Sequence, residues 1–278
     1  MQKTKELVQY NADTYEIQYQ QLVEKILNRG ELREGRNGKT YSLFGETLTF
    51  DLANNNMPLL DGRQVFYKSV LGELAALLRQ PKTIEDFRKF GCNYWDLWAK
   101  ANGDINVDYG NKWIDWNGVN QLDKLIETLK TNPTDRRMII TGWDPSNIEE
   151  LDLPCCHYTY QWYVREGKHL DMLWHQRSVD TMIGLPSDAV FAAAWNIAIA
   201  NEVGLQPGRV TMTLGDTHIY EEHKQAALDY LDTDISDVPQ PKFELLSRIG
   251  KKTIEFMPED LEISNYEPRS KVRFELKS

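Results

Sequence analysis

Groups that can carry out covalent chemistry gather in one short segment of the chain. LDLPCCHYTY, residues 151–160, holds Cys155 and Cys156 directly before His157. A cysteine beside a histidine is a candidate nucleophile, because its thiolate can form a covalent bond with an electron-poor carbon. Taken alone, either cysteine is equally well explained as a small buried apolar residue.

The alternation of side chains along a strand separates the two sulfur atoms. If residues 155–164 are extended, successive side chains point to opposite faces, so both sulfurs cannot enter one pocket. One face then carries Cys156, Tyr158, Tyr160 and Trp162. The other face carries Cys155, His157, Thr159 and Gln161.

Two pairs of residues offer groups that bind phosphate. HQRSVD, residues 175–180, sets the guanidinium of Arg177 beside the hydroxyl of Ser178, and both groups bind phosphate oxygens. An arginine near a thiol also lowers its pKa, because the positive charge favours the thiolate. DRR places Arg136 beside Arg137. Taken singly, the first pair is also typical of a surface salt bridge and the second of a solvated face.

Two further motifs contain candidate ligand-binding side chains. GLPSD, residues 184–188, opens an apolar segment with Asp188, which is either a helix N-cap or a ligand-binding acid. GDTHIY holds His218 and Tyr220 two residues apart, and hence on one side of an extended segment. Such a pair is also common as half-buried strand residues. The order and spacing of all these motifs carry more weight than any one of them.

The charge of the chain argues against a nucleic-acid-binding protein. The 278 residues carry a formal net charge of −10, which repels a phosphate backbone or an anionic membrane. A local cluster of arginines can still bind a small phosphorylated ligand. No basic region precedes an apolar core at the N-terminus, so we expect no secretory signal. The apolar run 189–200 is interrupted by Asn196 and predicts a buried helix.

Cysteine usage predicts a reducing compartment. The three cysteines are an odd number, two of them are adjacent, and adjacent cysteines rarely pair with each other. We therefore expect a cytoplasmic protein. The sequence contains no CxxC or HExxH motif, so we expect no zinc site.

Periodicity and turn residues predict an α+β fold in a single domain, residues 1–278. Helices are expected over 14–30, capped by Asp13 or Thr14, and over 67–80, 119–133 and 187–204. Strands are expected over 137–143 and 209–220, with a hairpin over 157–178 that turns at Glu166 and Gly167. Residues 40–50 predict either a strand pair or one strand bulged around Gly45.

The order of the motifs resembles the thymidylate synthase family. DRR, PCCH with QWYV, QRSVD, GLPSD and GDTHIY follow one another in the order found in that family. SVLGEL, YWDLW and NGDINVDYG resemble its glutamate helix, folate-contacting tryptophans and active-site tyrosine. GRNGKTYSLFG resembles its phosphate loop, with one residue fewer and without the usual run of glycines and threonines. The resemblance covers most of the chain and implies a large mixed sheet packed with helices, with sheet faces that form a homodimer interface.

The resemblance also implies which residues react. Cys156 aligns with the family's nucleophile, which adds to C6 of a pyrimidine nucleotide, and Cys155 falls where typical members have no cysteine. Glu73 would organise water and move protons. Tyr109 and Gln176 would support the pyrimidine. The one-carbon donor would be 5,10-methylenetetrahydrofolate, and no metal is implied.

The remaining implied contacts bind the phosphate, the sugar and the folate. Arg36, Arg177 and Ser178 would hold the 5′-phosphate, and Arg136 and Arg137 would reach it from the other subunit. His218 and Tyr220 would hydrogen-bond the sugar 3′-hydroxyl. Trp95, Trp98 and Asp180 would line the folate side of the site.

Three departures from the family pattern point to a different substrate and product. Asp188 stands where thymidylate synthases have asparagine, and a carboxyl group can accept a hydrogen bond from the 4-amino group of cytosine. The same aspartate occurs in phage deoxycytidylate hydroxymethylases, and GDIN is closer to their form than to that of typical synthases. The chain also ends in the charged segment 266–278 instead of a short apolar tail, which suggests a wetter site and the addition of water instead of hydride.

The sequence thus favours a deoxycytidylate (dCMP) 5-hydroxymethyltransferase, for which phage DNA modification is the usual context. The alternatives are a dCMP 5-methyltransferase, a hydroxymethylase of the ribonucleotide CMP, and an ordinary thymidylate synthase acting on dUMP. A non-catalytic nucleotide- or RNA-binding protein on the same scaffold is the alternative outside the enzyme class.

Overall fold

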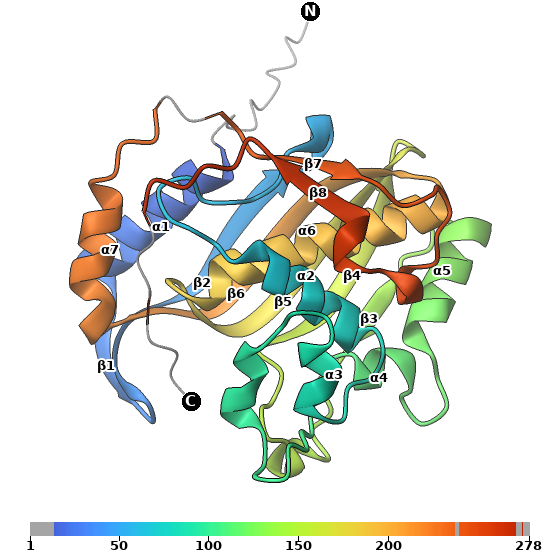
Figure 1. Cartoon of the computed structure of the whole chain (residues 1–278), viewed down its shortest axis with the longest axis horizontal. Helices are drawn as coiled ribbons and strands as arrows, with labels where there is room; N and C mark the ends of the chain where they lie inside the picture. Colours follow the sequence, from blue (N-terminus) through green and yellow to red (C-terminus); the bar gives the residue numbers. More distant parts are fainter. Residues whose placement is uncertain (1–13, 237–238, 271–273, 275–278) are drawn as a thin grey trace, which may run out of the picture.

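A six-stranded mixed sheet forms the centre of the molecule (Figure 1). The computed structural model describes residues 14–236, 239–270 and 274. The strands lie in the order β1-β2-β6-β5-β4-β3. Their bounds are Glu31–Gly35 (β1), Gly38–Asp51 (β2), Ile139–Thr141 (β3), His157–Arg165 (β4), His169–Asp180 (β5) and Gln206–Tyr220 (β6). Only β5 and β6 pair in parallel within this sheet, and the other pairs are antiparallel.

Helix α6, Gly184–Val203, connects the two parallel strands and is the most deeply buried helix. It packs against β5 and β6 on one side and against α2, Tyr67–Leu77, on the other (Figure 1). Because protein covers it on both sides, its sequence is apolar all round. The one polar side chain at its middle, Asn196, donates its Nδ2 to the Leu170 carbonyl at 2.9 Å.

Smaller elements surround this core. The helices are α1 (Tyr15–Arg29), α3 (Ile84–Arg88), α4 (Asn111–Ile114), α5 (Gln121–Thr131) and α7 (Lys224–Leu231). Among the described residues, 3₁₀ turns lie at 53–55, 94–98, 148–150, 221–223, 253–255 and 258–260. A separate hairpin pairs β7, Lys242–Leu245, with β8, Leu261–Ser264. Within the described ranges, none of these helices combines the length and apolar character needed to span a bilayer.

Local sequence signals account for several element boundaries. The Thr14 hydroxyl caps α1 by accepting from the Ile17 N–H at 3.4 Å; the alternative cap, Asp13, lies outside the described residues. The hairpin turn between β4 and β5 falls at Glu166 and Gly167, as predicted, and both have positive φ, 56° and 65°. Strand β2 is continuous through Gly45, whose φ of 85° marks a local distortion. This agrees with the bulged-strand alternative.

Two predictions of local geometry are wrong. The strict alternation that put His157 on the face opposite Tyr160 and Trp162 fails, because β4 has a register shift between His157 and Thr159. His157 Nδ1 and the Tyr160 hydroxyl are 2.6 Å apart, on one side of the strand. Helix α6 begins at Gly184, about one turn earlier than predicted, and its N-cap is Ile183. Asp188 is therefore inside the helix and is not its N-cap.

Gly110, directly after Tyr109, packs closely against the backbone at the end of α2. A Cβ atom at Gly110 would lie 1.9 Å from the Leu77 carbonyl oxygen, and its φ is 70°. We expect Gly110→Ala to lower the free energy of unfolding by about 2–4 kcal/mol, through overpacking and backbone strain. Gly118 has a similar φ of 82° but no atom within 4 Å, so Gly118→Ala isolates the backbone strain at about 1 kcal/mol. Urea denaturation of both variants measures the difference, and equal losses would contradict the close approach.

Candidate active site

A cavity of about 320 Å³ opens beside the end of β5 and the start of α6. It brings together every predicted site residue except Arg136 and Arg137. The side chains lining it are Arg36, Glu73, Trp95, Trp98, Tyr109, Cys156, Gln176, Arg177, Ser178, Asp180, Asp188, His218 and Tyr220. Residues separated by more than 180 positions therefore contribute to one hollow.

The parallel pairing of β5 and β6 explains this convergence. It sets Ser178 opposite Asp216 and Asp180 opposite His218. Parallel strands end at the same edge of a sheet, so the polar residues that end both strands meet there. The antiparallel neighbour β2 then brings in the β1–β2 turn, which carries Arg36.

Cys156 lines the cavity at the point where β4 begins. Its backbone N–H donates to the Tyr109 hydroxyl, and its Sγ lies 3.9 Å from Nη2 of Arg177. Burial raises the pKa of the Cys156 thiol, while the Arg177 charge lowers it. The sequence predicted the effect of the arginine, but desolvation outweighs it, so the thiol of the free protein is protonated at neutral pH.

Arg177 holds the loop that carries both cysteines. Its Nε donates to the Cys155 carbonyl at 2.8 Å and its Nη2 to the Pro154 carbonyl at 3.0 Å. The guanidinium lies over the Trp143 ring, 5.6 Å from its centroid. These contacts fix the backbone directly before Cys156, so the position of the sulfur depends on the arginine.

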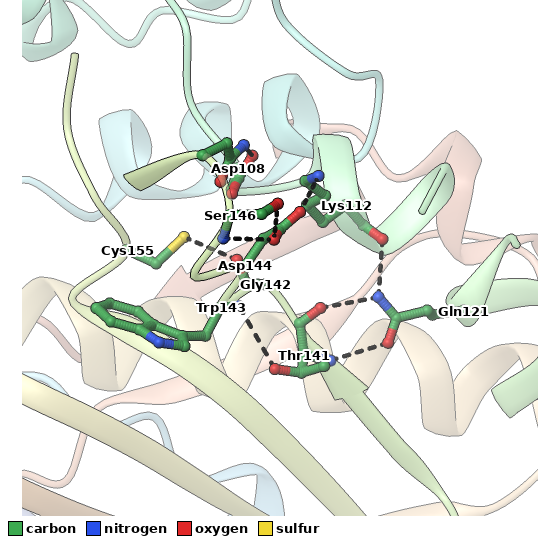
Figure 2. A network of polar contacts seen from close by, with 10 residues as sticks. Asp108, Lys112, Gln121, Thr141, Gly142, Trp143, Asp144, Ser146 and Cys155 are labelled. Carbon is green, nitrogen blue, oxygen red and sulfur yellow. Dashed lines mark hydrogen bonds and ion pairs between the residues drawn. The ribbon is translucent and has the colours of Figure 1, made fainter. Parts of the chain in front are cut away.

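Cys155 points into a different polar network (Figure 2). Its Sγ lies 3.7 Å from the Gly142 carbonyl oxygen, in the segment that follows β3. Nearby, Lys112 and Asp144 form an ion pair at 2.6 Å, and the Gln121 amide bonds both backbone groups of Thr141. Cys155 is 2% exposed, and burial raises the pKa of its thiol. Its surroundings are those of a packing residue.

Glu73 is held inside the cavity by two aromatic donors. The Tyr94 hydroxyl donates to one carboxylate oxygen at 2.6 Å, and the Trp95 indole N–H donates to the other at 2.7 Å. Burial raises the pKa of Glu73 to about 7, although both hydrogen bonds lower it. Glu73 therefore exchanges a proton near neutral pH. The role of Tyr94 was not predicted, although it is the first residue of the YWDLW motif.

Asp188 faces the same cavity and has a fixed partner. Gln176 Nε2 donates to Asp188 Oδ2 at 2.6 Å, and Gln176 Oε1 accepts from the Trp174 indole N–H at 3.0 Å. Burial raises the pKa of Asp188 to about 7, the Gln176 hydrogen bond lowers it, and the nearby charges of Glu73 and Asp180 raise it. The carboxyl group is thus available in both its neutral and its charged form near pH 7.

The groups at the outer end of β6 are also paired. His218 Nδ1 lies 3.0 Å from Asp216 Oδ1, and Arg33 pairs with the same carboxylate at 3.3 Å. The His218 bond holds the pKa of Asp216 below its usual value. Asp180 Oδ1 accepts from the Met182 and Ile183 N–H groups, so this residue also shapes the turn before α6.

The family comparison agrees with this geometry. The thymidylate synthase family model matches residues 17–278, almost the whole chain. The chain belongs to the thymidylate synthase family. Thymidylate synthase family enzymes transfer a one-carbon unit from methylenetetrahydrofolate to C5 of a pyrimidine nucleotide. In the part of the chain that the structure describes, no three histidine, cysteine or acidic side chains are grouped as metal ligands.

Two thymidylate synthase motif residues lie away from the cavity. Arg136 and Arg137 precede β3. The Arg137 guanidinium pairs with Asp135 at 2.6 Å, and its side chain is 88% exposed. In a single chain these arginines therefore do not contribute to the cavity that the other site residues form.

His157 lines the cavity although no role was predicted for it. Its ring packs against Trp174 and Tyr109 in tilted arrangements, with centroids 4.3 Å and 4.6 Å away. Burial lowers the pKa of His157 to about 3, so it is a neutral imidazole. Its position next to Cys156 was visible in the sequence, but its neutral state depends on aromatic residues that come from other elements.

The raised pKa of Glu73 predicts a pH-dependent cost to stability. Between pH 4.5 and about 7, the unfolded chain releases the Glu73 proton while the folded protein retains it, so the stability of the wild type falls as the pH rises. Glu73→Gln removes this loss. Relative to wild type, we expect the free energy of unfolding of the variant to rise by on the order of 3 kcal/mol between pH 4 and pH 8.

Urea denaturation across this pH range measures that difference. Glu24→Gln is the matched control, because Glu24 is exposed on α1. A difference between wild type and Glu73→Gln that stays constant from pH 4 to pH 8 would contradict the assignment.

Proposed function

We propose that this protein is a dCMP 5-hydroxymethyltransferase. It would transfer the one-carbon unit of 5,10-methylenetetrahydrofolate to C5 of dCMP, and water would complete the reaction to give 5-hydroxymethyl-dCMP. The proposal is more specific than the family activity in two respects. It names cytosine as the base that is recognised, and it names water as the species that adds to the last intermediate.

The buried carboxyl group of Asp188 carries the choice of base. Cytosine presents a 4-amino donor and an N3 acceptor, whereas uracil presents an O4 acceptor and an N3–H donor. A neutral carboxyl group offers one acceptor oxygen and one O–H donor, which complement cytosine, and burial favours this neutral form. A charged carboxylate facing uracil O4 would leave two acceptors opposed, which costs about 1–3 kcal/mol.

The rim of the cavity suits a nucleotide monophosphate. Arg36, Arg177 and Ser178 line it together and would bind the 5′-phosphate. Asp216 holds the proton of His218 on Nδ1, because an ionised carboxylate can only accept. In a neutral imidazole this leaves Nε2 as an acceptor for a sugar hydroxyl, beside Tyr220.

The aromatic wall of the cavity fits the co-substrate. Trp95 and Trp98 line it with Leu153 and Ile183, a surface on which a flat pterin ring can stack. Asp180 also lines the cavity and would offer a carboxylate to the N–H groups of such a ring. When bound, methylenetetrahydrofolate supplies the one-carbon unit for C5 and departs as tetrahydrofolate.

Cys156 would begin the chemistry and Glu73 would move protons. The thiol passes its proton to water in the cavity, its sulfur bonds to C6, and the electron pair of the C5–C6 double bond moves to C5, which bonds to the one-carbon unit. Glu73 lies in the same cavity and, with ordered water, would accept the C5 proton and later activate the water that adds to the exocyclic methylene. The C5–C6 double bond is restored as the thiolate leaves.

Water would complete the reaction instead of hydride. Tyr94 and Trp95 hold both oxygens of Glu73 at fixed positions, and its pKa of about 7 lets it activate water at neutral pH. A dCMP methyltransferase, a CMP hydroxymethylase and a dUMP-specific synthase are the alternatives that the products distinguish. A non-catalytic binding protein would convert none of the nucleotides.

Separate assays with dCMP, CMP and dUMP test the proposal. With methylenetetrahydrofolate, we expect turnover of dCMP to 5-hydroxymethyl-dCMP and formation of tetrahydrofolate, both followed by mass analysis. Dihydrofolate as the product would show methylation instead. Turnover of dUMP alone would reject the role of Asp188 in base selection.

Asp188→Asn should shift the preference toward uracil. A carboxamide offers an acceptor and an NH₂ donor in fixed positions, which match N3–H and O4. We expect kcat/KM for dCMP to fall by about 10²-fold, and that for dUMP to rise relative to it, the size of one or two buried hydrogen bonds. An unchanged ratio of the two values would contradict the proposed contact.

We also propose a homodimer whose phosphate site includes Arg136 and Arg137 of the second subunit. Exposed apolar side chains on the sheet support this: Ile139 and Tyr163 are 43% and 64% exposed and alternate with buried neighbours. A second copy packed on this face would cover them. It would also bring the exposed arginines before β3 near a neighbouring cavity.

Mixing two impaired variants tests the shared site. Arg136→Ala should weaken nucleotide binding, and Cys156→Ala should abolish turnover. In a mixed dimer, one of the two cavities contains an intact Cys156 and receives an intact Arg136 from the other subunit. If the subunits exchange freely, about half of the dimers are mixed, so we expect about a quarter of the wild-type activity. Each variant alone is the control, and the absence of recovery in verified mixed dimers would contradict a shared site.

A further inference from the structure

Two buried side chains, Trp174 and Gln176, and the half-buried Asp188 form a directed chain of hydrogen bonds that ends at the cavity. Trp174 Nε1 donates to Gln176 Oε1 at 3.0 Å, and Gln176 Nε2 donates to Asp188 Oδ2 at 2.6 Å. Trp174 and Gln176 are 0% and 4% exposed, so water does not compete for these groups. Only Gln176 and Asp188 line the cavity.

The indole N–H determines the direction of the whole chain. An indole N–H can only donate, whereas a glutamine amide has one accepting end and one donating end. The oxygen of Gln176 must therefore face Trp174, and its NH₂ group must face Asp188. Turning the amide over would set two donors against each other at Trp174, in a place where neither can find water.

Packing prevents the indole from turning away. The Trp174 ring contacts His157, Tyr160 and Phe191, with ring centroids 4.3 Å, 4.9 Å and 5.9 Å away. Trp174 and Gln176 are two residues apart on β5, so the strand itself directs both side chains to one face. The position of the N–H group is thus fixed by the core, away from any substrate.

The direction of the chain determines which oxygen of Asp188 can carry a proton. Because Gln176 donates to Oδ2, this oxygen remains an acceptor, and a proton on the carboxyl group resides on Oδ1. This form offers the acceptor and the O–H donor that cytosine needs. With the amide reversed, Gln176 Oε1 would accept a hydrogen bond from the Oδ2 hydroxyl, which leaves Oδ1 as an acceptor. The carboxyl group would then have no free O–H donor for N3 of cytosine, and two acceptors would face each other there.

We propose that Trp174 is a positioning residue for base selection, which orients the Gln176 amide so that Asp188 presents the hydrogen-bonding pattern of cytosine. This inference rests on the proposed preference for dCMP. It assigns part of that preference to a residue that touches neither the nucleotide nor the co-substrate. Trp174 would act through one N–H group, two side chains away from the base.

Replacement of that single N–H group is the sharpest test. 3-Benzothienylalanine, incorporated at position 174, keeps the bicyclic shape and puts sulfur in place of the indole N–H. Trp174→Phe removes the same group by ordinary mutagenesis. Trp195→Phe is the matched control, because Trp195 is also 0% exposed and lies in the same aromatic cluster. Its Nε1 has no hydrogen-bond partner among the described residues.

The measurement is the ratio of kcat/KM for dCMP to kcat/KM for dUMP. We expect this ratio to fall about tenfold in both position-174 variants, the effect of one hydrogen bond, and to stay within about twofold of wild type in Trp195→Phe. An unchanged ratio in the sulfur analogue would overturn the inference, whatever the behaviour of Trp174→Phe. A wild-type enzyme that uses dUMP and not dCMP would overturn the proposed function itself, and the inference with it.

The pH dependence of dCMP binding gives a readout that packing alone would not move. In the wild type, the donated Gln176 N–H lowers the pKa of Asp188. Without the indole N–H the amide can turn its oxygen to Asp188, which favours the protonated acid, so we expect the apparent pKa for dCMP binding to rise. An equal shift in Trp195→Phe, or none at position 174, would overturn the inference.

The other titratable groups near Asp188 are the same in the wild type and in the position-174 and position-195 variants. The charges of Glu73 and Asp180 raise its pKa, and its own charge raises the pKa of Cys156, Tyr160 and Tyr15. Because none of these side chains is altered, the change in the apparent pKa between wild type and each variant reports on Gln176. Isothermal titration with dCMP between pH 5.5 and 8.5 would supply the values.

Discussion

The candidate site depends on the parallel pairing of β5 with β6 around the buried helix α6. This pairing sets Asp180 opposite His218, and the connection between the strands places Asp188 in the second turn of the helix. The helix can be apolar all round only because the sheet and α2 cover it on both sides. The same packing that stabilises the core therefore brings polar groups from distant segments to one edge of the sheet.

Burial is the main influence on the chemistry of the cavity. It raises the pKa of Cys156, Glu73 and Asp188, and in each case it outweighs hydrogen bonds or a charge that act in the opposite direction. The free protein consequently holds two acids that exchange protons near neutral pH, beside a protonated thiol. Such groups destabilise the folded state as the pH rises, which is a common property of sites that transfer protons.

The aromatic core does more than fill space. Trp174 and Trp95 each donate an indole N–H to a polar side chain of the cavity, while Trp195 packs in the same core without such a partner among the described residues. An indole can only donate, so each of these contacts imposes a direction on the group that receives it. A cavity lined in this way fixes which atoms accept and which donate before any ligand binds.

The sequence by itself determined the α+β class, most helices and strands, and the family to which the motifs belong, because these depend on spacing along the chain. It also identified Asp188 as the residue that departs from the family pattern. Tertiary structure decided what spacing cannot express. The register shift in β4 places His157 on the same side of the strand as Tyr160. The Cys155 sulfur contacts the Gly142 carbonyl. Desolvation raises the pKa of Cys156, where the sequence predicted a fall. Each of these outcomes depends on residues that are distant in sequence, since burial and cross-strand pairing exist only after the chain has folded.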